Sequence, residues 1–100
     1  MNPFELLKQM GTIETQMKTI KEQLSLLKAT GSSGAGLVEV SINGDYHVER
    51  IEINPVMLNP DDKSTLEVLL VSAFNDATEK MKSNIEDYTR QKLSSMGIRQ

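Results

Sequence analysis

Few side chains in this sequence are of the types that carry out catalysis. Cysteine is absent and the one histidine is His47, which excludes thiolate chemistry, disulfides and zinc sites built from cysteines or paired histidines. Asp61-Asp62 resembles a catalytic carboxylate pair, but it follows Asn59-Pro60, where a helix is expected to begin and acids are favoured by the helix dipole. Ser32-Ser33 has no general base that the sequence places beside it. We therefore expect no enzyme, no cofactor and no small-molecule substrate.

The glycine-rich segment Gly31-Ser-Ser-Gly-Ala-Gly36 shares only its glycine content with phosphate-binding loops. A Walker loop requires Lys-Ser/Thr after its last glycine, and a dinucleotide loop requires G-x-G-x-x-G between a strand and a helix. Here the order is G-x-x-G-x-G and a strand-like segment follows. We interpret the segment as a hairpin loop whose glycines supply positive φ angles.

Basic side chains near the two ends of the chain are the remaining candidates, because they could bind phosphates. Residues 1–28 hold four lysines and three acids, and residues 80–100 hold five cations and two acids. Between them lie nine acids with Arg50 and Lys63, and the whole chain has a net charge of −3. The candidate phosphate contacts are Lys8, Lys18, Lys21, Lys80, Lys82, Arg90, Lys92 and Arg99. Such contacts position a protein on DNA without reading its sequence.

The first group of cations belongs to a helix predicted over residues 3–28. Asn2-Pro3 with Glu5 in the first turn is a helix start. The apolar residues Leu6, Met10, Ile13, Met17, Ile20, Leu24 and Leu27 are then spaced alternately four and three apart. This seam is typical of a helix that grips another helix. If the seam packs on the second long helix, the two helices are antiparallel and the chain termini lie together, away from the sheet.

A small antiparallel sheet of two or three strands is predicted over residues 29–54. Val38, Val40 and Ile42 alternate on one face, and Asn43-Gly44 predicts a type I′ hairpin turn. The returning strand, Tyr46 to Ile53, changes apolar phase after Val48, which predicts a β-bulge or a change of buried face. Asn54-Pro55 is expected to begin a single helical turn.

The second group of cations belongs to a helix predicted over residues 60–96. At 1.5 Å per residue it would be roughly 54 Å long, so it must project from a domain of this size. Its first half is apolar nearly all round and should be buried on more than one side. A sheet this small is not stable alone. A homodimer through sheet edges and the apolar base of this helix would supply the missing cover.

Three segments of the sequence resemble the YbaB/EbfC family of bacterial nucleoid-associated proteins. They are TGSSGAGLVEVSING from Thr30, RIEINP from Arg50 and AFNDA from Ala73. The resemblance covers the whole chain as a single domain, residues 1–100. It implies an α+β fold, α-β-β-β-α, that forms a homodimer with projecting helical arms like tweezers. It also implies a cytoplasmic, non-enzymatic protein of the nucleoid that binds double-stranded DNA with low sequence specificity and affects gene expression.

Many members of the family carry lysine or arginine on the strands, where this sequence has Glu39 and His47-Val48-Glu49. We therefore place the DNA contacts on the arms. The sequence has no apolar run of about 18 residues and no export signal, so neither a membrane association nor secretion is expected. A second function stays open, that of a dimeric protein-interaction module whose arms bind a partner helix. The net acidity favours this alternative.

Overall fold

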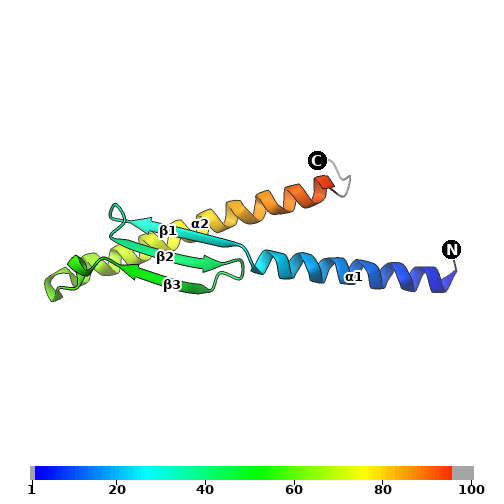
Figure 1. Cartoon of the computed structure of the whole chain (residues 1–100), viewed down its shortest axis with the longest axis horizontal. Coiled ribbons are helices and arrows are strands. Elements are labelled where there is room, and N and C mark those ends of the chain that lie inside the picture. The colour runs from blue at the N-terminus through cyan, green and yellow to red at the C-terminus, as the bar shows by residue number, and fades with distance from the viewer. Residues whose placement is uncertain (1, 96–100) are drawn as a thin grey trace.

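The computed structural model describes residues 2–95, in which two helical arms leave the same end of a small body (Figure 1). The elements are α1 (Pro3–Ser25), β1 (Lys28–Ser33), β2 (Val38–Asn43), β3 (Val48–Ile53), the 3-10 turns Pro55–Met57 and Pro60–Asp62, and α2 (Lys63–Ser95). The described part measures 71 × 24 × 15 Å with a radius of gyration of 19.9 Å. A compact chain of this length would have a radius near about 13 Å. The predicted α-β-β-β-α order and projecting arms are confirmed.

The sheet has the strand order β1-β2-β3 with both pairs antiparallel. Val38, Val40 and Ile42 of β2 are buried on its inner face, as their alternation predicted. Of the two alternatives predicted for the phase change after Val48, β3 has the bulge: Ser41 pairs with Arg50 and Ile42 with Val48, so Glu49 is the extra residue.

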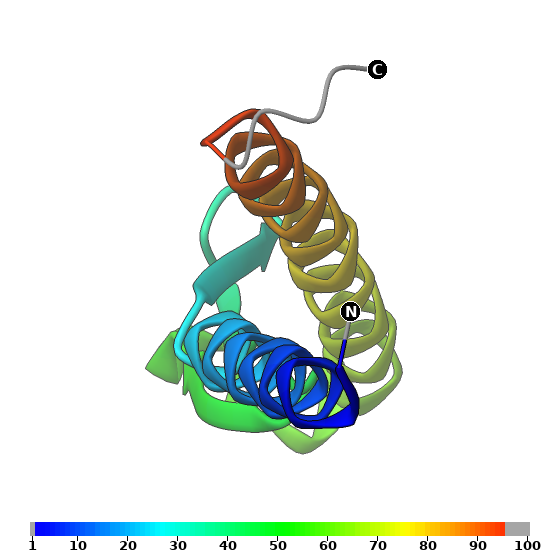
Figure 2. The ribbon, with the colours of Figure 1, turned by 90° about the vertical axis from the view of Figure 1, so that its right-hand side faces the viewer.

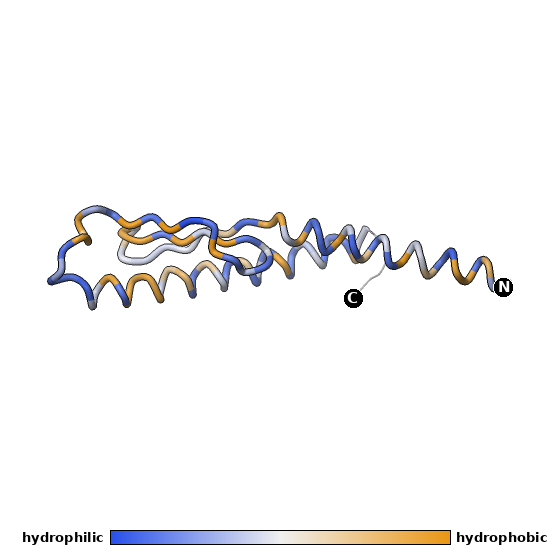
Figure 3. Tube along the Cα trace, turned by 90° about the horizontal axis from the view of Figure 1, so that it is seen from below, coloured by the Kyte–Doolittle hydropathy of each residue, from blue (hydrophilic) through white to orange (hydrophobic). Residues whose placement is uncertain are grey.

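α2 covers the inner face of this sheet as a second layer (Figure 3). It packs across β1 and β2 through Ala73, Ala77 and Met81, all fully buried. Gly31 permits this contact, because a Cβ at Gly31 would overlap the Ala73 carbonyl oxygen and the Ala77 backbone nitrogen. The small residues of α2 and the glycine of β1 therefore let helix and strand approach closely.

The start of α2 and the turn before it follow the predicted asparagine-proline pattern. The Asn54 side chain accepts the Val56 N–H at 3.0 Å, and a single 3-10 turn follows it. The Asn59 side chain accepts the Asp61 N–H at 3.0 Å, and the chain passes through the 3-10 turn Pro60–Asp62 before α2 begins at Lys63. The expectation of a helix from residue 60 was therefore three residues early.

The first helix ends earlier than the predicted residue 28. α1 stops at Ser25, and Lys28–Ser33 form β1, so Gly31 lies in a strand and not in the loop. The positive φ angles fall at Gly34 (60°), Ala35 (55°) and Gly36 (90°). Pairing with β2 draws this segment into the sheet.

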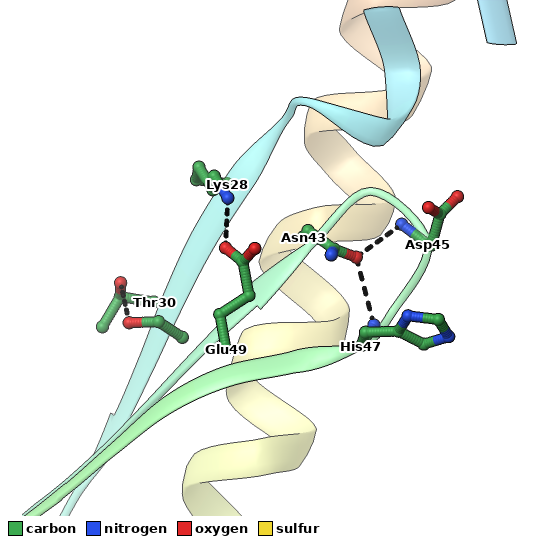
Figure 4. Close-up of polar contacts among 7 residues, drawn as sticks. Lys28, Thr30, Asn43, Asp45, His47 and Glu49 are labelled. Carbon is green, nitrogen blue, oxygen red and sulfur yellow. Dashed lines mark hydrogen bonds and ion pairs between the residues drawn. The ribbon is translucent and has the colours of Figure 1, made fainter. Parts of the chain in front are cut away.

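The prediction of a two-residue type I′ turn at Asn43-Gly44 is wrong. Asn43 ends β2, and a four-residue loop follows it, with the positive φ (62°) at Tyr46. The Asn43 side chain accepts the N–H groups of Asp45 at 2.9 Å and His47 at 3.2 Å, which holds the loop (Figure 4).

α1 does not pack against α2 along its length, contrary to the antiparallel packing considered for a single chain. The two helices diverge when viewed along the arms (Figure 2). No residue of α1 is buried, and the seam residues Leu6, Met10, Ile13 and Met17 are between 52% and 66% exposed. The body holds only the last turn of α1, so its apolar seam meets solvent.

Candidate nucleic-acid interface

The lysines of α1 project into solvent along an arm with no tertiary contacts over most of its length. Lys8, Lys18 and Lys21 are exposed, and none of them makes an ion pair within residues 2–95. Lys8 and Lys18 lie on the side of the helix away from the apolar seam. Their ammonium groups can therefore reach phosphate oxygens without disturbing any packing.

Lys80 lies beside the sheet and not on a free arm. Its Nζ pairs with Asp76 Oδ2 at 2.9 Å and donates to the Thr30 carbonyl oxygen at 3.3 Å. The hydrogen bond from Lys80, together with one from the Ser32 N–H, lowers the pKa of the Asp76 carboxyl below its ordinary value. Of the candidate cations, Lys80 is thus engaged in holding α2 to β1.

The outer part of α2 carries two more candidates, each near another side chain. Arg90 Nη1 lies 3.4 Å from Asp87 Oδ1, and Lys92 Nζ lies 5.6 Å from the centre of the Tyr88 ring. The Arg90–Asp87 pair is exposed and the Lys92–Tyr88 contact is half-buried, and both contacts are weak, so either cation can exchange its contact for a phosphate. Lys82 makes no ion pair within the described part of the chain, and Arg99 lies outside it.

The outer face of the sheet is polar, and its cations are already paired. Lys28 forms an ion pair with Glu49 (Figure 4), and Arg50 forms one with Glu52. The Lys28 hydrogen bond lowers the pKa of the Glu49 carboxyl, which keeps it ionised opposite that cation. With Glu39 added, acids outnumber bases on this face, so it is poorly suited to phosphates.

A hollow of about 270 Å³ lies between the two arms. It is lined by Thr15, Gln16, Thr19, Ile20 and Gln23 of α1 and by Lys92 and Ser95 of α2. The Tyr88 hydroxyl donates a hydrogen bond to Gln23 Oε1 and so joins the two helices. Its lining combines the apolar Ile20 with hydroxyl, amide and ammonium groups, and groups of the latter kinds can bind phosphate oxygens.

Two other classes of site find no support in residues 2–95. No three His, Asp or Glu side chains in this range are grouped to hold a metal ion. None of its helices has the length and apolar character to cross a bilayer.

A model of the YbaB/EbfC DNA-binding family matches residues 1–96. The chain belongs to this family. The fold of this chain is similar to that in the crystal structure of the uncharacterized protein HP0035 from Helicobacter pylori, which is 25% identical. The match covers 93% of this chain and 98% of that one, with a TM-score of 0.72. YbaB/EbfC is a DNA-binding family and not an enzyme family, in agreement with the scarcity of catalytic side chains.

In this YbaB/EbfC protein the seven candidate cations within residues 2–95 fall into separate groups rather than one patch. Three lie on α1 and two on the outer part of α2, while Lys80 and Lys82 lie beside the body. Nothing in the sequence indicated the Tyr88–Gln23 contact, because the two residues are 65 positions apart. Nor did the sequence distinguish Lys80 from its neighbours, since its partner Thr30 is 50 positions away.

Proposed function

We propose that this protein is a nucleoid-associated protein that binds duplex DNA as a homodimer with low sequence specificity, in the bacterial cytoplasm, and so affects nucleoid organisation and gene expression. The observation that carries the proposal is the match to a DNA-binding family over residues 1–96, in a chain whose exposed cations stand on projecting arms.

The proposed DNA contacts are Lys8, Lys18, Lys21, Lys80, Lys82, Arg90, Lys92 and Arg99. The three α1 lysines should contribute most, because they have no ion-pair partner within residues 2–95. Lys80 should contribute least, since it must leave Asp76 and Thr30 to reach a phosphate. Contacts of this kind give affinity that falls steeply with salt and depends little on base sequence.

The homodimer in this proposal would have two effects. It doubles the number of arms, which compensates for the modest charge of each one. It also covers apolar surface: Val68 and Val71, near the start of α2, are more than half exposed in the single chain. Exposed apolar patches of this kind mark interaction surfaces in soluble proteins.

Fluorescence anisotropy of a labelled duplex of about 30 base pairs, titrated at several salt concentrations, tests the DNA-binding proposal. We expect log K to fall linearly with log salt and a scrambled duplex to bind equally well. Replacing Lys8, Lys18 and Lys21 by Glu should abolish binding. The matched control compares two single reversals that change the charge equally, Lys18→Glu on the arm and Lys63→Glu at an exposed site on the body. Equal loss in both variants would contradict contacts by the arm.

The alternative function, a module that binds a partner protein, is supported by the exposed α1 seam. The two functions differ in how they respond to nuclease. Partners that remain bound to the immobilised protein after DNase treatment would favour the alternative, and a duplex that fails to bind even at low salt would exclude the DNA-binding proposal.

A further inference from the structure

Tyr88 contacts both arms through the two ends of its side chain. Its hydroxyl donates a hydrogen bond to Gln23 Oε1, in the last turn of α1. Its ring lies beside Lys92, one turn further along α2, with Nζ 5.6 Å from the ring centre. Within residues 2–95 the bond between Tyr88 and Gln23 is the one hydrogen bond that joins α1 to α2. We call this bond the arm tie.

Burial along the apolar seam of α1 shows where the arm tie lies. Ile20 and Leu24, the seam positions on either side of Gln23, are half-buried. The seam positions from Leu6 to Met17 are more than half exposed, and the two helices diverge (Figure 2). The arm tie therefore lies at the base of the arms, where α1 is still held.

The end of α1 is held from the hairpin as well. The Gly44 N–H donates to the Ser25 carbonyl oxygen at 3.3 Å. Leu26 and Leu27 alone connect α1 to β1, so the covalent chain would allow the helix to pivot there. Contacts from two separate elements, the hairpin and α2, restrain this pivot.

A small rotation at the base of α1 displaces its outer lysines by a large distance. Lys8 lies about 27 Å along the helix from Leu26, at 1.5 Å per residue. A rotation of about 10° at Leu26 would move Lys8 by about 5 Å, more than the rise of about 3.4 Å between successive phosphates of one DNA strand. The fit of the α1 lysines to a DNA backbone is therefore sensitive to the contacts at the base.

We propose that Tyr88 is a positioning residue for DNA binding, and that its hydroxyl fixes the separation of the α1 and α2 cations through the arm tie. This role rests on the proposed function and adds to it a residue that acts through the arms and not through contact with DNA. Two linked binding elements strengthen each other only when both can engage the ligand at once. The arm tie holds Lys18 and Lys21 of α1 at one separation from Lys92 of α2.

Distances between the arms test the arm tie without DNA, because the natural chain has no cysteine and can be spin-labelled at two introduced ones. Glu14→Cys and Gln91→Cys place the labels at exposed sites of α1 and α2. Excess unlabelled chain ensures that distances within one chain dominate in double electron–electron resonance. Tyr88→Phe should broaden the distance distribution and shift its maximum by several ångströms. Tyr46→Phe, at the other tyrosine of the sequence, is the matched control and should change neither.

A double-mutant cycle assigns the effect to the bond itself. Gln23→Leu should broaden the distribution as Tyr88→Phe does, and the double variant should be no broader than either, because both changes remove the same bond. Gln23→Glu keeps an acceptor for the hydroxyl and should retain the natural distribution. Gln9→Leu, the same change on the same face of α1, is the control and should have no effect. An unchanged distribution in Tyr88→Phe, or additive effects in the double variant, would overturn the arm tie.

The salt dependence of DNA binding tests the consequence for function. Tyr88→Phe removes no charge, yet it should lower the slope of log K against log salt by about 0.9 for each phosphate that the displaced arm no longer reaches. Its affinity should fall at least about fivefold, because the two arms no longer engage together. Simple destabilisation would not change the slope, since the folded fraction would still make every contact. Tyr46→Phe should bind as the natural chain does.

The two measurements separate the role of Tyr88 from the proposed function. A Tyr88→Phe chain that has a broadened distance distribution but the natural affinity and slope overturns the positioning role and leaves DNA binding intact. A natural chain that does not bind duplex DNA even at low salt overturns the proposed function, whatever the distances between the arms.

Discussion

Gly44, at the tip of the β2–β3 hairpin, lies directly against the carbonyl group of Leu24 in the last turn of α1. The Gly44 N–H donates to the Ser25 carbonyl oxygen at 3.3 Å, and no space remains for a Cβ. The hairpin loop thus closes the end of α1 and sets the direction in which the arm leaves the body. Gly44 therefore helps to position the cations of α1, because its lack of a side chain permits this contact.

Gly44→Ala should therefore turn the α1 arm away from its present direction. The new methyl group overlaps the Leu24 carbonyl, so the hairpin and the helix end must separate. Overpacking of this kind costs about 1–3 kcal/mol. Small-angle scattering should show a changed arm geometry, and thermal unfolding a lower midpoint.

The matched control for this variant is Gly11→Ala, which meets open space within the same helix. It should stabilise α1 by about 1 kcal/mol and leave the arm direction unchanged. An unaltered scattering profile for Gly44→Ala would show that the hairpin does not orient the arm.

Gly31→Ala should damage the body rather than the arms. Its methyl group overlaps backbone atoms of Ala73 and Ala77, which cannot move without displacing α2 from β1. We expect destabilisation at or above the upper end of the about 1–3 kcal/mol range, measured by urea unfolding. Retention of the natural urea midpoint would contradict the close approach of α2 and β1.

Acid should weaken the attachment of α2 to β1 through Asp76. The folded state lowers the pKa of this carboxyl, mainly through the Lys80 hydrogen bond. The ionised carboxylate thus adds stability above its unfolded pKa, and that contribution is lost as the pH falls through the lower, folded pKa. The window lies below about pH 4. Urea midpoints should fall less steeply with acid in Asp76→Asn than in the natural chain.

Glu14→Gln is the control for this pH series, because it removes one exposed carboxylate from α1, outside the body. Its midpoints should follow those of the natural chain at every pH. If the urea midpoints of Asp76→Asn and the natural chain fell equally with pH, Asp76 would not be a cause of the acid sensitivity.

Neutralising lysines should separate DNA contacts from structural contacts. Replacing Lys8, Lys18 and Lys21 by Gln should reduce the slope of log K against log salt by about 0.9 for each phosphate that a lysine no longer neutralises. Lys80→Gln should leave that slope nearly unchanged but lower the thermal midpoint, because Lys80 bonds to Asp76 and Thr30. The reverse pattern would place Lys80 in the interface and the α1 lysines outside it.

Local signals in the sequence predicted much of this fold. Asn-Pro pairs begin the helical segments because the asparagine side chain accepts a free N–H there. The alternation of Val38, Val40 and Ile42 identified the buried face of β2, and the phase change after Val48 identified the bulge. Each of these features depends on neighbours within a few residues.

Features that depend on distant residues could not be predicted in this way. β1 is rich in glycine and serine, which have no preference for strands, and it exists because β2 pairs with it and Gly31 admits α2. The types and spacing of the candidate cations were visible, whereas the engagement of Lys80 with Thr30 was not. The hairpin turn was predicted wrongly because Gly44 serves contact with Leu24 and not a positive φ angle.

The absence of buried side chains from α1 has a consequence for how the arm meets a ligand. A helix anchored at one end only is marginally stable along its length, because most helical stability in proteins comes from packing. Backbone amide exchange should therefore quicken steadily from Ser25 toward Pro3. A ligand that binds Lys8 must also hold the outer turns of α1 in helical conformation. Its binding and the helicity of the arm are therefore thermodynamically linked. Added DNA should raise the helical circular dichroism signal in proportion to the fraction bound.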